Sequence, residues 1–296
     1  MSEIETMRAM LRQLIKRDAP PLSLADMRAA FDGWGESYPL PEGAATEPKT
    51  LGGIGALKVS ASRSSADRAL LYMHGGGYAI GSIKSHRHLV AQLCEASGFV
   101  GYALDYRLAP ETVFPGAVDD AVSAYRALLE SKISAQKIVI AGDSAGGGLT
   151  AATALALKAL GLPQPAGLFC ISPWADLSQT GASYAANAER DLIVDQTALD
   201  QWAGLYLSGQ SAKNPLASPV HGDFSGLAPM LIHVGSDEVL LSDSTRLAEA
   251  AGMARVPVEL LIAPDMPHVW HFMWAQLAPA REAIARAGAW MRSRAA

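Results

Sequence analysis

Cysteine is scarce in this chain: Cys94 and Cys170 are the only two among 296 residues. They lie far apart and outside any CxxC pattern, so the sequence offers neither a disulfide framework nor a zinc cluster, and we predict two buried free thiols. Basic residues are not in excess either, because the formal net charge is −5. No run of lysine and arginine supplies the phosphate-neutralising surface that nucleic-acid binding requires, so we expect no nucleic-acid partner.

Long apolar runs are also missing. The chain has no stretch of about 18 uncharged apolar residues, the length needed to span a membrane. Residues 1–23 mix charged with apolar residues, unlike a secretory signal peptide. We therefore expect a cytoplasmic protein without a membrane partner. The chain does have length and apolar content: 296 residues, 50% of them hydrophobic, predict a large core and one main domain.

Short apolar runs alternate with helical ones from about residue 50 onward. The runs that we read as strands are residues 54–60, 69–73, 100–105, 137–141, 167–171, 230–234 and 258–262. The runs that we read as helices are residues 85–97, 115–132, 145–160, 242–251 and 278–294. Strands buried on both faces and alternating with helices predict an α/β fold with a mostly parallel sheet, in which the first two strands form an antiparallel edge.

Two regions break this alternation. Residues 4–16 and 24–34 have apolar residues at helical spacing, and a loop rich in proline and glycine over residues 38–48 separates them from the rest. Between the strands at 167–171 and 230–234, the interval is too long for an ordinary crossover and includes helical residues at 195–207. We expect a lid or an inserted helical subdomain there.

A serine stands where an apolar strand runs into an alanine-rich helix, in the segment Gly142-Asp143-Ser144-Ala145-Gly146. The segment fits the pattern GxSxG together with the strand and the helix that this pattern requires. The turn is so sharp that only glycine fits two positions before and two positions after the serine. The serine is left exposed at a helix N-terminus, where the helix dipole favours a developing anion. We predict that Ser144 is a catalytic nucleophile rather than part of a structural glycine-rich turn.

A serine hydroxyl needs a histidine to accept its proton, and the chain has seven histidines. His268 lies in the loop after the last predicted strand and can return over Ser144, whereas we expect His271 to pack within the following segment. Asp237 follows the preceding strand and would orient the imidazole; its neighbours Glu238 and Asp243 are the alternative acids. The chain order Ser144, Asp237, His268 is the order found in α/β-hydrolases.

A glycine-rich run, His74-Gly75-Gly76-Gly77, follows the strand at 69–73. Because glycine has no side chain, such a run lets backbone N–H groups approach the substrate. We predict that the N–H groups of Gly75, Gly76 and Ala145 form an oxyanion hole and that His74 organises the loop. The nucleotide-binding patterns GxGxxG and GKS/T are absent, which argues against phosphate binding.

The histidines of the segment SHRH raise the question of a metal. His86 and His88 are two residues apart on a predicted helix, so their side chains point to different faces and do not readily share an ion. We therefore expect no metal and no other cofactor.

Several motifs of the chain resemble those of the bacterial hormone-sensitive lipase family of esterases. HGGGY, DYRLAPE at residues 105–111, GDSAGG, SPW at residues 172–174, and SDE followed by PHVWH occur in matching order between about residues 70 and 275. The resemblance implies the α/β-hydrolase fold: a mostly parallel eight-stranded sheet flanked by helices, with a helical cap. It places the catalytic core at residues 48–172 and 221–296 and the cap at residues 1–47 and 173–220.

The resemblance also implies a function. A member of this family is a carboxylesterase that hydrolyses short- to medium-chain carboxylic esters without a cofactor, so its partner is a small-molecule ester. In the family, the DYRLAPE loop is structural, which implies a buried ion pair between Arg107 and Glu111, and Asp143 is architectural. Homodimers paired through the last strand and its helix are common in the family.

The substrate pocket and the exact reaction stay open at this point. The pocket candidates are apolar residues of the N-terminal arm and aromatic residues within the motifs, namely Met27, Phe31, Trp34, Tyr78 and Trp174. The same triad would serve a lactone or a carbamate-like ester, and a triglyceride lipase is a further alternative. Plant gibberellin receptors keep this fold without catalysis, but they lack the triad histidine, and His268 is present here.

Overall fold

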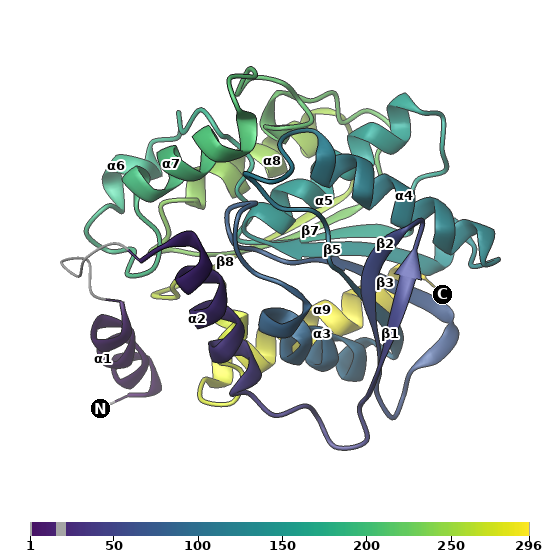
Figure 1. Ribbon diagram of the computed structural model, residues 1–296, viewed down its shortest axis with the longest axis horizontal. Coiled ribbons are helices and arrows are strands. Elements are labelled where there is room, and N and C mark those ends of the chain that lie inside the picture. Colours follow the sequence, from purple (N-terminus) through teal and green to yellow (C-terminus); the bar gives the residue numbers. More distant parts are fainter. Residues whose placement is uncertain (1, 16–21, 296) are drawn as a thin grey trace.

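The computed structural model describes residues 2–15 and 22–295 and shows a sheet between two layers of helices (Figure 1). Within these residues, eight strands form one sheet in the order β1-β2-β4-β3-β5-β6-β7-β8. The strands are β1 (Ala45–Leu51), β2 (Ile54–Ser60), β3 (Ser65–Met73), β4 (Phe99–Leu104), β5 (Ile138–Asp143), β6 (Gly167–Ile171), β7 (Met230–Gly235) and β8 (Val258–Ala263).

Neighbouring strands from β4 to β8 are parallel, which confirms the predicted mostly parallel sheet. The antiparallel edge is formed differently from our prediction. It consists of β1 paired with β2, and β2 pairs with β4. The first part of β1 lies in the predicted loop at residues 38–48, which its proline and glycine content indicates, and six of the seven residues of β1 are exposed, so the strand carries no apolar run. Gly52 and Gly53, with φ of 58° and 88°, form the tight turn that joins the two strands.

Helices cover both faces of the sheet (Figure 1). On one face lie α4 (Gly116–Glu130), α5 (Ala145–Ala159) and α8 (Leu241–Met253), and on the other face lie α3 (Ile83–Ser97) and α9 (Ala278–Arg294). Every strand and helix predicted from residue 54 onward is present, with ends that differ by a few residues. The periodicity was informative here because these elements are buried against one another.

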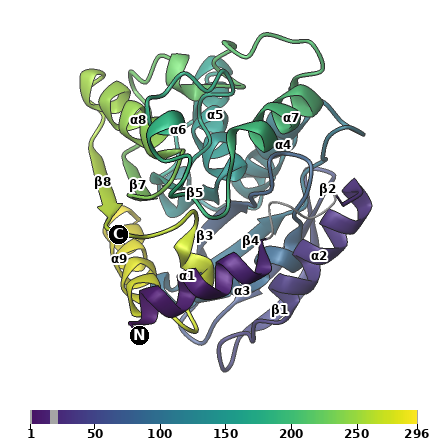
Figure 2. The same ribbon diagram turned by 90° about the vertical axis from the view of Figure 1, so that its left-hand side faces the viewer.

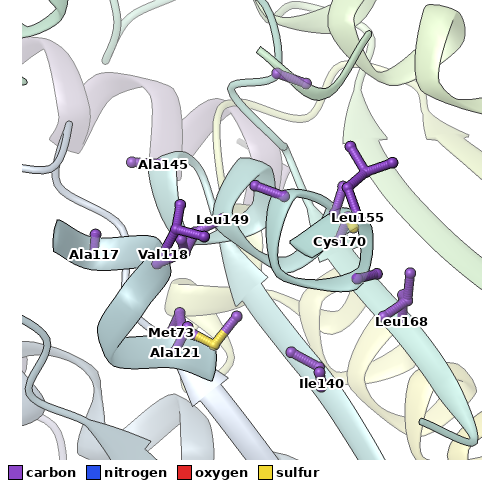
Figure 3. Packing of buried hydrophobic residues seen from close by; sticks show 14 of the residues in the cluster. Met73, Ala117, Val118, Ala121, Ile140, Ala145, Leu149, Leu155, Leu168 and Cys170 are labelled. Carbon is purple, nitrogen blue, oxygen red and sulfur yellow. The ribbon is translucent and has the colours of Figure 1, made fainter. Parts of the chain in front are cut away.

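A packed core fixes the junction between β5 and α5. Figure 3 shows Val118 of α4 and Leu149 of α5 above Ile140 of β5 and Leu168 of β6. Leu149, Ile140 and Leu168 have no exposed surface, and Val118 is 2% exposed. Close packing of this kind leaves few voids and has low compressibility. The turn that carries Ser144 therefore stands on a rigid base.

The N-terminal arm forms two helices, α1 (Glu3–Leu14) and α2 (Leu24–Glu36), as the spacing predicts. Residue 16, the last of the first predicted helix, lies outside the described residues. Figure 2 shows α1 crossing in front of α9. Met7 and Leu11 of α1 are buried in a cluster with Met266 and Trp270 of the loop after β8. Helix α1 therefore covers the loop that carries His268.

The long interval after β6 contains α6 (Ser183–Ala186) and α7 (Gln196–Leu207), so the predicted helix at 195–207 is confirmed. This interval packs onto loops at the carboxyl edge of the sheet. The side chain of Asn187 donates to the carbonyl of Ser236 at 3.0 Å, and the carbonyl of Tyr206 accepts from the N–H of Phe114 at 2.8 Å. No helix in the described part of the chain is long and apolar enough to cross a membrane.

Candidate active site

Ser144 occupies the tight turn between β5 and α5. Its backbone has φ 54° and ψ −120°, an unusual conformation for a residue with a side chain. The flanking glycines have no room for one: a Cβ on Gly142 would overlap with the carbonyl oxygen of Gly146, and a Cβ on Gly146 would overlap with that of Met73. The serine is left partly exposed at the N-terminus of α5. This is the geometry that the GxSxG segment predicts.

A histidine and a carboxylate meet where the chain leaves β8 and β7. The Nδ1 atom of His268, in the loop after β8, is 2.8 Å from Oε2 of Glu238, which follows β7. His268 is 7% exposed and Glu238 has no exposed surface. Oε1 of Glu238 accepts hydrogen bonds from the N–H of Gly235 at 2.5 Å and from the hydroxyl of Ser172 at 2.7 Å. The carboxylate is thus fixed and in turn fixes the imidazole.

The carboxylate on His268 belongs to Glu238 and not to Asp237, so the prediction that Asp237 orients the imidazole is wrong. The carboxylate of Asp237 pairs with Arg8 of α1 instead. The two acids are adjacent in a turn, where successive side chains point in different directions. Glu238 is the one that faces the buried side of the turn.

One short segment links the serine to this histidine and carboxylate. The segment 172–174 follows β6, the neighbour of β5 in the sheet. The N–H of Trp174 donates to the carbonyl of Ser144 at 2.9 Å, while Ser172 binds Glu238. In the part of the chain that the structure describes, no hydrogen bond joins Ser144 Oγ to His268; such contacts often tighten only when substrate binds. The loops that carry the two side chains are nevertheless fixed by the same segment.

Backbone N–H groups that could bind an oxyanion lie beside Ser144. The N–H of Gly75 is not one of them, because it donates to Oδ1 of Asp143 at 3.1 Å, so that part of the prediction is wrong. Within residues 2–15 and 22–295, the N–H groups of Gly76, Gly77 and Ala145 have no hydrogen-bond acceptor. Ala145 begins α5, where helical N–H groups lack partners. Gly76 and Ala145 stay predictions, and Gly77 joins them in place of Gly75.

A buried network of hydrogen bonds around Asp143 holds the glycine loop. Asp143 accepts from the hydroxyl of Tyr72 at 2.7 Å and lies 3.2 Å from Nε2 of His86. Burial by itself raises the pKa of Asp143, but the charge and hydrogen bond of His86 and the hydrogen bond of Tyr72 outweigh it and hold the pKa below its usual value. An ionised Asp143 can therefore anchor Gly75, which agrees with an architectural role.

The model of a family with the α/β-hydrolase fold matches residues 70–272 of this chain. The chain belongs to this family. An acetyl-hydrolase of Streptomyces hygroscopicus is 49% identical over 226 residues, which are 76% of each chain. Among solved structures, an esterase of the bacterial hormone-sensitive lipase family is 39% identical with a TM-score of 0.96 over 100% of both chains. EstE5, in a crystal soaked by p-nitrophenyl butyrate, is 40% identical with a TM-score of 0.96 over 99% of both chains.

The predicted resemblance to the bacterial hormone-sensitive lipase family is thus confirmed, and the α/β-hydrolase described here is an ester hydrolase. The fold prediction, an eight-stranded α/β-hydrolase sheet flanked by helices, is confirmed as well.

Titration of His268 should set the lower pH limit of the hydrolase. Burial lowers the pKa of His268, but the hydrogen bond and the charge of Glu238 outweigh it and raise the pKa above its ordinary value. A general base must be neutral, so kcat/KM is expected to fall as the pH decreases through a pKa above about 6.5. In Glu238→Gln the midpoint should move to lower pH. A wild-type pH profile whose acid midpoint lies well below that of free imidazole would contradict this assignment.

Two other histidines of the hydrolase, His233 and His271, lie side by side in the interior. His271, the alternative to His268, is buried with its Nε2 3.0 Å from Nδ1 of His233, in agreement with a packing role. Burial lowers the pKa of His233 to about 3, so it stays neutral. In the described part of the chain, no group of three or more histidine, cysteine, aspartate or glutamate side chains could hold a metal ion. Both cysteines are free and buried, as predicted.

The pocket candidates of the hydrolase fall into two groups. Phe31 and Trp34 of α2 pack on the ring of Phe272 at 6.1 and 5.1 Å and, like Met27, are partly exposed. For these three residues a pocket role stays a prediction. Tyr78 and Trp174 are 1% and 0% exposed, so they lie beneath the site, and a role on the pocket wall is wrong for both.

One aromatic residue that the sequence did not single out lies against the glycine loop. A Cβ on Gly77 would overlap with the ring of Trp202, on α7. Trp202 is partly exposed, so it can contact a ligand beside the N–H of Gly77. Only its place in the predicted helix 195–207 could have drawn attention to it.

The charged residues of the DYRLAPE loop form other ion pairs than the one that the resemblance implies. Arg107 pairs with Asp120 at 2.6 Å, and Glu111 pairs with Arg28 of α2 at 2.7 Å. The side chains of Arg107 and Glu111 are 55% and 62% exposed. The prediction of a buried ion pair between these two residues is therefore wrong. Arg107 binds helix α4 instead, and Glu111 binds helix α2.

Proposed function

We propose that this α/β-hydrolase cleaves short- to medium-chain carboxylic esters by two-step acyl transfer, with Ser144 as nucleophile, His268 as general base and Glu238 as the acid that orients it. The observation that carries the proposal is the buried hydrogen bond between His268 Nδ1 and Glu238 Oε2 at 2.8 Å, on loops tied to the Ser144 turn through residues 172–174. This arrangement fits the serine–histidine–acid logic of acyl transfer.

In the first step, His268 accepts the proton of the Ser144 hydroxyl while the serine oxygen attacks the ester carbonyl. The carbonyl oxygen becomes an oxyanion that the N–H groups of Gly76, Gly77 and Ala145 bind. His268 then gives its proton to the departing alcohol, which leaves an acyl group on Ser144. In the second step, water attacks that acyl group with the same proton transfers, and the acid is released.

The short-chain preference rests on the comparisons. The Streptomyces hygroscopicus relative is named an acetyl-hydrolase, and EstE5 was soaked by p-nitrophenyl butyrate. We further propose that α1, α2 and residues 173–220 form a cap over the carboxyl edge of the sheet. Two observations support this: Met7 of α1 is buried in one cluster with Trp270 after β8, and the ring of Trp202 of α7 lies against Gly77.

Hydrolysis of p-nitrophenyl esters from acetate to laurate tests the proposal. We expect the largest kcat/KM for the short acyl chains and a steady decline toward laurate, with Ser144→Ala as the background control. A panel of lactones measured in parallel separates the alternative substrate class. Turnover of lactones with inert open-chain esters would overturn the proposed substrate, and a wild type inert toward both would overturn the proposed reaction.

A further inference from the structure

We propose that Arg28 is a positioning residue for the oxyanion hole, because it ties helix α2 to the loop that carries Gly76 and Gly77. The inference rests on the proposed function, since an oxyanion hole has a role only in acyl transfer. Arg28 lies on the N-terminal arm, far in the sequence from every motif that carries the chemistry.

The guanidinium of Arg28 makes four hydrogen bonds. Nε donates to the carbonyl of Ala79 at 2.8 Å, and Nη2 donates to the carbonyl of Ala109 at 2.9 Å. Nη1 and Nη2 also bind the two carboxylate oxygens of Glu111 at 2.7 and 2.8 Å. The planar fork of arginine suits this set of acceptors, whereas a lysine ammonium cannot satisfy all of them at once.

Ala79 belongs to the turn that presents the oxyanion donors. Its N–H donates to the carbonyl of Gly76 at 3.0 Å and so closes the turn that contains Gly77. Gly76 and Gly77 have φ of 113° and 59°, and glycine is the most flexible residue in such conformations. The shape of the turn therefore depends on its hydrogen bonds, and Arg28 supplies one that reaches it from helix α2.

Ala109 holds the same loop from its other side. The N–H of Ala109 donates to the carbonyl of Tyr78 at 2.8 Å, while its own carbonyl accepts from Arg28. Ala79 and Ala109 have no exposed surface. Loss of the guanidinium would leave two carbonyls of buried residues without this donor, which favours a shift of the loop toward other partners.

Glu111 orients the guanidinium without adding much stability. Its side chain is 62% exposed, and ion pairs at such exposure are weak. The hydrogen bond from Arg28 still lowers the pKa of Glu111 to about 2, so the pair is charged at neutral pH. We therefore expect a smaller effect from Glu111→Gln than from a change of Arg28 itself.

The surroundings of Arg28 allow a chemical rescue. A cavity of about 340 Å³ is lined by Arg28, Glu111 and Arg107 among others, and the exposed side chain of Glu111 marks its opening to solvent. A small guanidinium ion can enter the space that a truncated Arg28 leaves and bind the same acceptors. Arg107 offers a matched control, because it lines the same cavity but binds Asp120 rather than the glycine loop.

The test compares kcat and KM of Arg28→Ala, Arg28→Lys, Glu111→Gln and Arg107→Ala with p-nitrophenyl acetate. Arg28→Ala is expected to lower kcat by up to about 100-fold, the order of loss that a small misplacement of catalytic groups causes, with KM nearly unchanged. Arg28→Lys should lie between Arg28→Ala and the wild type, and Arg107→Ala should match the wild type. Methylguanidine should restore kcat of Arg28→Ala in a saturable way, but not that of the variant that also carries Glu111→Gln.

Unchanged kcat in Arg28→Ala would overturn the inference, as would a loss that Arg107→Ala shares or that methylguanidine does not reverse. If Arg28→Ala shows no cooperative thermal transition and is therefore not folded, Arg28→Lys replaces it in the test. A kcat of Arg28→Lys below that of Glu111→Gln, at equal melting temperature, supports the inference. An equal kcat of the two variants overturns it. An inactive wild type would instead point to failure of the proposed function.

Discussion

Replacing either Ser144 or His268 with alanine is expected to lower kcat for p-nitrophenyl acetate by about a millionfold. Alanine at 144 removes the oxygen that carries the acyl group. Alanine at 268 removes the base without which the serine hydroxyl is a poor nucleophile. Steady-state rates at high enzyme concentration, corrected for hydrolysis by buffer, measure both effects.

The double variant of Ser144 and His268 provides the internal check. Because the two groups act as one unit, the double variant should be about as slow as either single variant rather than showing the product of the two losses. The activity that persists above buffer would come from substrate binding and from the oxyanion donors. A single variant that kept a substantial fraction of wild-type kcat would exclude its residue from the triad.

Replacing Glu238 with glutamine is expected to lower kcat by about 10⁴-fold, the cost of neutralising a triad acid. The amide keeps the size of the side chain but lacks the charge that stabilises the imidazolium. It can also present an N–H to Nδ1 of His268, which favours the wrong tautomer. The comparison of kcat for wild type and Glu238→Gln, with the melting temperature of each, measures this effect.

Asp237→Asn is the matched control for that experiment, since it removes the same charge one residue away. The carboxylate of Asp237 binds Arg8 and not the imidazole, so kcat should change only slightly. The reverse pattern, with Asp237→Asn nearly inactive and Glu238→Gln active, would restore Asp237 as the triad acid.

The buried elements of this fold could be predicted from the sequence because their apolar periodicity reports directly on packing. Strand β1 could not, since it lies at the sheet edge with nearly all its residues exposed and is held by backbone hydrogen bonds to β2. Backbone pairing leaves no trace in an apolar pattern.

The residues of the candidate site also divide into those that the sequence could predict and those that it could not. The turn at Ser144 has a steric requirement for glycine, which the sequence displays. The choice between Asp237 and Glu238 depends on which side chain a short turn directs inward, and both residues are chemically able to hold His268. Gly75 and Gly77 are likewise the same residue type in one run, and their roles are distinguished by the structure, in which the N–H of Gly75 is bound by Asp143 and His86.

Contacts between distant segments account for the remaining differences. Arg107 and Glu111 lie four residues apart, yet each binds another element, Asp120 of α4 and Arg28 of α2. Tyr78 and Trp174 stand beside catalytic motifs but are covered, in part by the ring of Tyr206 that stacks on Tyr78 at 3.8 Å. Burial of a side chain by a segment more than a hundred residues away does not follow from local pattern.

Covalent labelling with a p-nitrophenyl phosphonate tests the central claim, that Ser144 carries the acyl group during ester hydrolysis. The reagent transfers its phosphonyl group to an activated serine oxygen and leaves a stable adduct. We expect one adduct per chain by intact mass, located on Ser144 by peptide mapping, with loss of esterase activity in proportion to labelling and no adduct on Ser144→Ala. An adduct on another residue that tracks the loss of activity, or full labelling of Ser144 with activity retained, would contradict the account.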